Sequence, residues 1–297
     1  MRTAIALVLF VSAVICSAPA FGQEQDIYKD PTLAPWANLV WKQLGAKQWD
    51  ALLDTLIKAE SELSDKASVY DVARLIKGDN YQALMPVLKK RVSGKKGNLV
   101  LRLLLLSGFG SSPGGSTEFR KLVNGLTAEL GEDTGLWAVL AEICLNYRAD
   151  PEMMRYSLEL TRTLVKRDPE NWHCSYMYLM AINYFKQEAE VQVESQRVLK
   201  RWPKNKDLLC EVESVCENAK QWSSAVDAAK RLVQLVNPNE VTSEKFSLAK
   251  LYEKAGMTAE AIQLYGELKN DESVGPGDRE VADEALARLR PRQRSEE

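Results

Sequence analysis

The stretch from Glu244 to Leu268, EKFSLAKLYEKAGMTAEAIQLYGEL, contains two amphipathic segments separated by a glycine. In the first segment, apolar residues recur three and four positions apart, which predicts a helix with one buried face. Gly256 predicts the end of this helix, and a second apolar stripe with the same spacing follows it. The two stripes consist of Phe246, Leu248, Ala249, Leu251 and Tyr252, and of Ala261, Ile262, Leu264, Tyr265 and Leu268. The stretch therefore predicts a helical hairpin.

The same pattern recurs upstream at a nearly constant interval. Pro169 and Pro203 lie in polar turns between neighbouring hairpins, and they are 34 positions apart. Ala225 and Ala261 occupy equivalent positions within two hairpins and are 36 positions apart. A period of about 34 residues is the length of one helix–turn–helix unit in repeat proteins. The chain is therefore expected to be built from stacked helical hairpins.

The fourth expected hairpin carries the most informative motif. Trp137, Leu140, Ala141 and Cys144 stand at the spacing Trp-x2-Leu-Gly-x2-Tyr, with alanine and cysteine replacing the last two residues. The chain thus resembles tetratricopeptide-repeat (TPR) proteins, most strongly over residues 135–268. This resemblance implies an all-α fold, namely a right-handed α-α superhelix (a TPR-like solenoid) of about seven helical hairpins with a C-terminal capping helix.

The repeats differ in regularity along the chain. Pro86 lies inside an expected helix, which it should kink or shorten. The run from Leu99 to Leu106 is apolar nearly all round and should form a fully buried element. The expected segments are a disordered lead-in at 23–31, degenerate helical-hairpin repeats at 32–130, TPR-like repeats at 131–270, a capping helix at 277–290 and a disordered tail at 291–297.

The first residues have the composition of a secretory signal peptide. Arg2 precedes a short apolar run that ends at Ile15, and about 12 apolar residues are too few for a transmembrane helix. We therefore expect a signal peptide at 1–22 and an exported protein, periplasmic or secreted, that does not span a membrane. Cys16 would permit a lipid-anchored form, but Ile15 stands where a small residue should precede a lipidated cysteine. Small residues near the expected cleavage site are Ala18, Ala20 and Gly22.

Four cysteines follow the expected signal peptide. Each lies on an expected helix where a small apolar residue would pack, so buried free thiols are one interpretation. Because exported proteins form disulfides, a bridge between Cys174 and Cys210 on neighbouring first helices is the other. The four residues are Cys144, Cys174, Cys210 and Cys216.

The sequence contains no convincing catalytic motif. The loop 107–117, SGFGSSPGGST, is similar to a phosphate-binding P-loop, but Ser116 occupies the position of its lysine. His173 is the only histidine, so one chain cannot form a metal site with several histidines. The formal net charge of -2 provides no broad basic surface for nucleic acid. We expect a non-enzymatic protein with no cofactor, no metal and no nucleic-acid partner.

The resemblance to TPR proteins also implies a partner-binding surface. First helices line the concave face of such arrays, and their outward positions contact the partner. Aromatic rings and amides there suit an extended peptide, because rings supply apolar area and amides both donate and accept hydrogen bonds. The positions carried over are Asn146, His173, Tyr176, Met180, Asn183, Tyr184, Asn218 and Lys250, together with Ala138, Glu142, Leu145, Cys210, Ser214, Glu217, Phe246, Glu253 and Lys254. A register shifted by one residue would instead place the tyrosines in the core.

These features lead to one expected function and two alternatives. We expect an exported scaffold that binds a protein or peptide partner in cell-envelope assembly or maintenance. The alternatives are an accessory domain or subunit of an envelope enzyme and a self-assembling structural protein. If Tyr176 and Tyr184 contact the partner, replacing both by alanine should abolish binding and leave helicity nearly unchanged. A large loss of stability would place them in the core.

Overall fold

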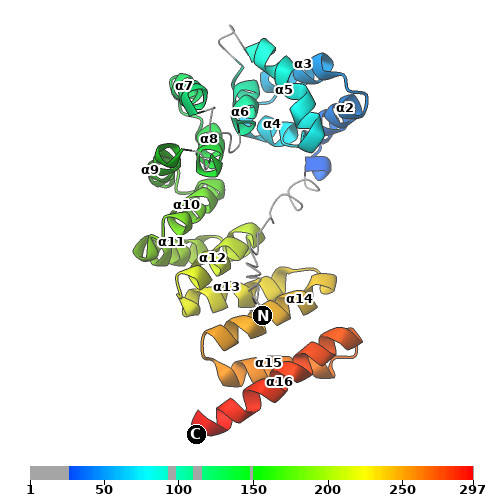
Figure 1. The fold of residues 1–297 in the computed structure, drawn as a ribbon, viewed down its shortest axis with the longest axis vertical. Coiled ribbons are helices and arrows are strands. Elements are labelled where there is room, and N and C mark those ends of the chain that lie inside the picture. Colours follow the sequence, from blue (N-terminus) through cyan, green and yellow to red (C-terminus); the bar gives the residue numbers. More distant parts are fainter. Residues whose placement is uncertain (1–26, 93–97, 110–115, 148–149, 297) are drawn as a thin grey trace, which may run out of the picture.

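The computed structural model describes residues 27–92, 98–109, 116–147 and 150–296 (Figure 1). Every regular element in these ranges is a helix, and they contain no strand, which confirms the predicted all-α class. Among the helices described, none combines the length and the apolar composition needed to cross a bilayer. The expected signal peptide and the centre of the P-loop-like segment, 110–115, lie outside the described residues.

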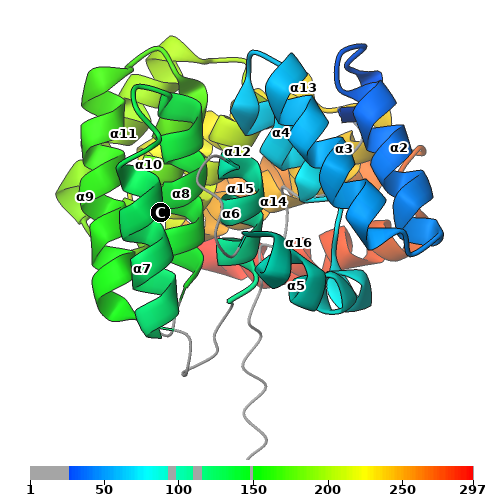
Figure 2. The ribbon, with the colours of Figure 1, turned by 90° about the horizontal axis from the view of Figure 1, so that it is seen from above.

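The helices follow one another with short connections. From α8 onward each helix packs against the next, and α10 also packs against α8 and α12. Figure 1 shows the α2–α6 group at one end of the molecule and α16 at the other, and Figure 2 places α6 and α8 between α2–α4 and α9–α11. The N-terminal helices are α2 (Ala34–Gly45), α3 (Trp49–Glu62), α4 (Lys66–Ala73), α5 (Gly78–Val92), α6 (Leu99–Ser107) and α7 (Ser116–Thr127). The others are α8 (Thr134–Asn146), α9 (Pro151–Arg167), α10 (Trp172–Tyr184), α11 (Glu188–Arg201), α12 (Lys206–Asn218), α13 (Trp222–Leu235), α14 (Pro238–Lys254), α15 (Thr258–Asn270) and α16 (Pro276–Glu296).

Two clusters of buried apolar side chains form the core, and both include residues of α8. The first cluster extends from Ile27 to Tyr147, and the second extends from Ala138 to Leu289. Leu140 belongs to the first cluster and Leu145 to the second, although both lie on α8. α8 is therefore the helix that joins the N-terminal helices to the C-terminal hairpins.

α6 is buried on all sides, as its sequence predicts. Every residue from Leu99 to Leu106 is buried, including Arg102, whose guanidinium pairs with Glu129 at 2.8 Å. The carboxylate of Glu60 on α3 accepts hydrogen bonds from the N–H groups of Leu99 and Val100, at 3.1 and 3.3 Å. This contact satisfies helix N-terminal N–H groups that have no partner within their own helix.

The turns within the hairpins share one backbone geometry. Lys186 and Lys220 both have positive φ, 53° and 56°, just after the first helix of a hairpin. The next residue, Gln187 or Gln221, donates its N–H to a carbonyl five positions earlier, at 2.8 and 2.7 Å. Such a left-handed residue satisfies the last carbonyls of a helix and reverses the chain. Gly256 has the same conformation, with φ 72°, which agrees with the helix end predicted there.

Two boundaries differ from those expected, and Pro86 does not shorten its helix. Ile27 lies in the expected disordered lead-in but is buried in the first cluster, at 8% exposure. α16 continues to Glu296, so 291–296 are helical and do not form a separate tail. Pro86 lies inside α5, which is nevertheless continuous from Gly78 to Val92.

Candidate functional site

Five of the predicted partner-binding residues, the largest group on one helix, lie on α10. This helix begins after Asn171, whose side chain accepts a hydrogen bond from the His173 N–H at 3.0 Å. Neighbouring helices cover its buried residues, and the remaining side chains differ in exposure. Tyr176 is partly buried against the second cluster, whereas Tyr184 is 51% exposed. The alternative register, with both tyrosines in the core, is therefore wrong for Tyr184.

α10 and α12 bring two predicted amides together. The Asn218 Nδ2 group donates a hydrogen bond to the Asn183 Oδ1 atom at 3.3 Å, across 35 positions of sequence. Met180 is partly buried one turn before Asn183. We call Tyr176, Met180, Asn183, Tyr184 and Asn218 the α10–α12 strip. The strip presents rings, a thioether and amides at the surface of two neighbouring helices.

Other predicted residues lie away from this strip or inside the protein. Asn146 is exposed at the end of α8, and Lys250 is exposed on α14. Within the described part of the chain, no hydrogen bond or ion pair joins either residue to the strip. Ala138 and Leu145 were expected to face a partner, but they are buried at 0% and 6% exposure. α8 packs on several sides, so these positions face neighbouring helices.

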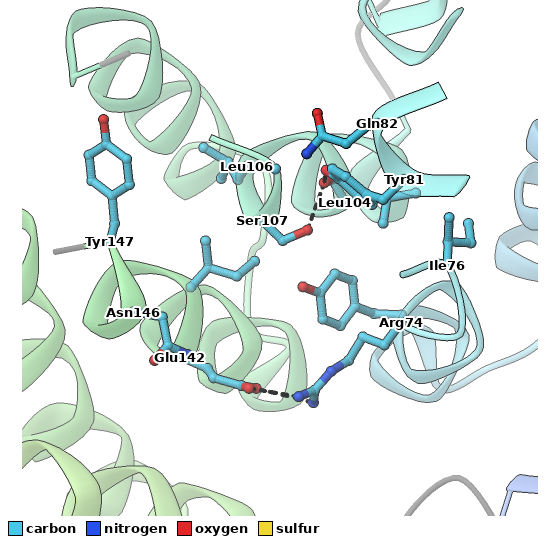
Figure 3. Close-up of a pocket in the computed structure, with 13 residues that line it drawn as sticks. Arg74, Ile76, Tyr81, Gln82, Leu104, Leu106, Ser107, Glu142, Asn146 and Tyr147 are labelled. Atoms are coloured by element: carbon cyan, nitrogen blue, oxygen red, sulfur yellow. Dashed lines mark hydrogen bonds and ion pairs between the residues drawn. The ribbon is translucent and has the colours of Figure 1, made fainter. Parts of the chain in front are cut away.

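An ion pair between α4 and α8 was not predicted. The Arg74 guanidinium donates to both oxygens of the Glu142 carboxylate, at 2.8 and 3.3 Å (Figure 3). Asp71 lies 3.8 Å from the same guanidinium. Glu142 was among the expected partner-facing residues, but both of its carboxylate oxygens accept from Arg74. No short-range sequence signal could have identified a partner 68 positions away.

A cavity of about 420 Å³ adjoins this ion pair. Figure 3 shows Arg74 and Glu142 at one end, with Tyr81 and Ser107 on a facing wall. Asn146, at the end of α8, also lines it. We call it the α4–α8 cavity, and its lining residues are Tyr70, Arg74, Ile76, Tyr81, Gln82, Leu104, Leu106, Ser107, Gly108, Glu142, Ile143, Asn146 and Tyr147.

His173 lines a second cavity, of about 660 Å³, at the N-terminal ends of α4, α8 and α10. Asp65, Asp133 and Asn171 line the same cavity, and each caps one of these helices. The Nε2 atom of His173 is buried and has no hydrogen-bond partner among the described residues. Burial lowers the pKa of this imidazole, so the neutral form is favoured at pH 7. His173 therefore lacks the positioned partner that a general base requires.

α12 carries two partly buried carboxyl groups, Glu211 near Tyr176 of α10 and Glu213 near Glu244 of α14. Burial raises the pKa of Glu211 to about 7, and it raises the pKa of Glu213 to about 7, with Glu244 and Glu217 adding repulsion. The charge of Glu211 acts on the Tyr176 hydroxyl.

The four cysteines are all free thiols, so the structure contains no Cys174–Cys210 disulfide. Three of them are buried, as one interpretation of the sequence predicts, but Cys210 is exposed. Groups of His, Cys, Asp and Glu able to hold a metal ion are absent from the described ranges.

In the second cavity the Ser68 hydroxyl donates to the Asp65 carboxylate, which also accepts from the N–H groups of Ala67 and Ser68 as the cap of α4. Comparison with known proteins adds no assignment: no family model matches the chain, and no curated protein is significantly similar to it.

Proposed function

We propose that this chain is an exported, non-enzymatic scaffold of the tetratricopeptide type that binds an extended polypeptide partner. It would form a right-handed solenoid of about seven helical hairpins, with α16 covering the last apolar face. The observation that carries the proposal is the α10–α12 strip. Tyr184 exposes half of its side chain there, beside the hydrogen-bonded amides of Asn183 and Asn218.

A constant interval between equivalent residues supports the repeat architecture. Asn171 and Asn205 cap α10 and α12 and are 34 positions apart. Lys186 and Lys220 adopt positive φ at the following turns and are also 34 positions apart. The helix caps and the turns recur with the same period, which supports a repeated hairpin unit.

The chemistry of the strip supports a polypeptide as the partner. Each primary amide has two donors and an acceptor, so Asn183 and Asn218 retain hydrogen-bonding capacity after pairing with each other. An extended main chain offers alternating donors and acceptors that can use this capacity. The exposed Tyr184 ring can add apolar contact at a small cost in side-chain entropy.

A peptide selection tests the proposal directly. A random peptide library displayed on phage is selected on the immobilised full chain, and enriched peptides are synthesised and titrated by calorimetry. We expect Tyr184→Ala to weaken binding of these peptides at least tenfold, because it removes the most exposed ring of the strip. The helical circular-dichroism signal should not change, since Tyr184 is 51% exposed.

Val193→Ala is the matched control, because Val193 is 70% exposed on α11, in the same hairpin as Tyr184. This variant should bind the selected peptides as the wild type does. The proposal fails if selection enriches no peptide above an unrelated helical protein. It also fails if Tyr184→Ala and the wild type bind with equal affinity.

A further inference from the structure

Hydrogen bonds and an ion pair within the chain fix the walls of the α4–α8 cavity. The Tyr81 hydroxyl donates a hydrogen bond to the Leu104 carbonyl, and the Ser107 hydroxyl donates to the same carbonyl at 2.7 Å (Figure 3). A side chain on Gly108 would overlap the Tyr81 hydroxyl, so glycine is required for this close approach. With Arg74 fixed on Glu142, the cavity is formed before any ligand enters.

The charges that line the cavity are already paired. Among the described residues of its lining, only Arg74 and Glu142 carry a charge at neutral pH. Both oxygens of Glu142 accept from Arg74, so a cation would have to compete with the guanidinium for this one lining carboxylate. An anion would have to compete with Glu142 and Asp71 for one guanidinium. Because transferring an unpaired charge out of water is costly, a neutral ligand group is favoured.

The rest of the lining combines apolar residues with two side-chain amides that have no hydrogen-bond partner among the described residues. Ile76, Leu106 and Ile143 are buried apolar residues of the wall. The side chains of Gln82 and Asn146 are exposed at the lining and make no hydrogen bond within the described part of the chain. The cavity thus offers apolar wall and hydrogen-bonding groups in similar measure, and apolar contact combined with a few polar groups is what sites for one organic group provide.

We infer that the α4–α8 cavity receives one uncharged apolar side chain of the bound polypeptide, with the adjoining main-chain amides hydrogen-bonded to Gln82 and Asn146. This inference rests on the proposed function, because it specifies the residue class that anchors the partner. The volume of about 420 Å³ accommodates an aromatic or a large aliphatic side chain together with adjoining main-chain atoms.

Blocked amino-acid amides isolate this interaction from the rest of the peptide. N-acetyl-phenylalaninamide, N-acetyl-argininamide and the α-amide of N-acetylglutamate supply the same main-chain groups with neutral, cationic and anionic side chains. Each is titrated against the full chain, and binding is measured by saturation-transfer NMR. We expect the phenylalanine amide to bind at least tenfold more tightly than either charged amide.

Two tryptophan variants locate the site. Asn146→Trp should place an indole at the cavity and weaken binding of the phenylalanine amide at least tenfold, whereas Gln192→Trp, at an exposed position of α11, should not. Circular dichroism establishes that both variants remain folded. The inference is overturned if a charged amide binds as tightly as the neutral one, if none of the three binds, or if the two variants behave alike.

The results also separate this inference from the proposed function. Peptides that depend on Tyr184, without binding of any blocked amide, would overturn the cavity assignment and leave the scaffold proposal standing. Binding of the phenylalanine amide without capture of any peptide would support the cavity as a site and overturn the scaffold proposal.

Discussion

Arg74 on α4 and Glu142 on α8 form a two-point ion pair, with N–O distances of 2.8 and 3.3 Å, across 68 positions of sequence. Glu142 lies on α8, the helix whose residues belong to both core clusters. Among the described helices of the N-terminal half, only a few pack against α8, and α4 and α6 are two of them. The ion pair therefore contributes to the attachment of the N-terminal helices to the C-terminal hairpins.

A double-mutant cycle should reveal this contribution. We expect Arg74→Met and Glu142→Gln each to reduce stability, because each leaves a partly buried polar group without its partner. The side chains are 34% and 18% exposed, so solvent screens the pair and a coupling of about 1 kcal/mol is expected. Urea unfolding of the two single variants and the double variant measures it. Strictly additive effects would contradict an energetic role for the contact.

Replacing Gly108 should disturb the cavity wall. Gly108→Ala places a Cβ where the Tyr81 hydroxyl lies, so Tyr81 must move and its hydrogen bond to Leu104 is lost. Overpacking of this kind costs roughly 1–3 kcal/mol, which thermal and urea unfolding can detect. In a Tyr81→Ala background the same glycine substitution should cost much less. Equal costs in both backgrounds would show that the close approach is not the cause.

The sequence predicts some of these features because they depend on local patterns. The buried α6 follows from its continuous apolar run, and exposure of Tyr184 follows from the helical register. The pair formed by Arg74 and Glu142 depends on how distant helices pack, which periodicity does not specify. The same holds for the burial of Leu145, since α8 packs on both clusters and has no clear polar side.

The hairpin turns carry a local signal that residue propensity does not reveal. A lysine followed by glutamine occurs at Lys186 and again at Lys220, and both lysines adopt the left-handed conformation that ends a first helix. Lysine has no particular preference for positive φ, so intrinsic propensity gives no reason to expect it there. Lys47, followed by Gln48, adopts the same conformation, so the recurring pair is a signal together with the interval of 34 positions between two of its copies.

The raised pKa of Glu211 predicts that the free energy of unfolding decreases as this carboxyl group ionises. Burial raises this pKa from its ordinary value of 4.5 to about 7 in the folded chain. The folded state therefore binds the proton more tightly, and the stability associated with that proton is present below pH 4.5 and is lost as pH rises through 7. Glu211→Gln removes the ionisation, and we expect it to stabilise the protein by about 1–2 kcal/mol at pH 8 after allowance for partial exposure.

Comparison of two pH values tests the sign of this effect. At pH 5 the folded Glu211 is mostly protonated, so the gain from Glu211→Gln should be much smaller than at pH 8. Glu260→Gln, at an exposed position of α15, serves as the control. Urea midpoints at both pH values measure the difference. A gain that is equal at pH 5 and pH 8, or larger at pH 5, would show that desolvation of the Glu211 carboxylate is not the source.

The cysteines should differ sharply in reactivity because they differ in access. Cys210 is exposed, whereas Cys144, Cys174 and Cys216 are buried. Burial raises the pKa of the Cys144 and Cys174 thiols to about 12. Although part of the Cys210 side chain is exposed, desolvation of its thiol and the negative charges of Glu244 and Glu213 raise its pKa to about 12 as well. The thiolate, which is the nucleophile, is therefore scarce at each of the three at neutral pH. Iodoacetamide should therefore modify Cys210 slowly, and alone, in the native protein, and the other three only after unfolding, as mass spectrometry of peptides would show.

Cys210→Ser is the control for this labelling, and it should abolish modification of the native protein. The free-thiol arrangement also has a definite alternative, in which Cys210 is joined to another cysteine. In that case oxidised protein would resist labelling at Cys210 until it is reduced, and its mass would be lower by two hydrogens. That result would show that the free-thiol arrangement is wrong and that a disulfide links Cys210 to another cysteine.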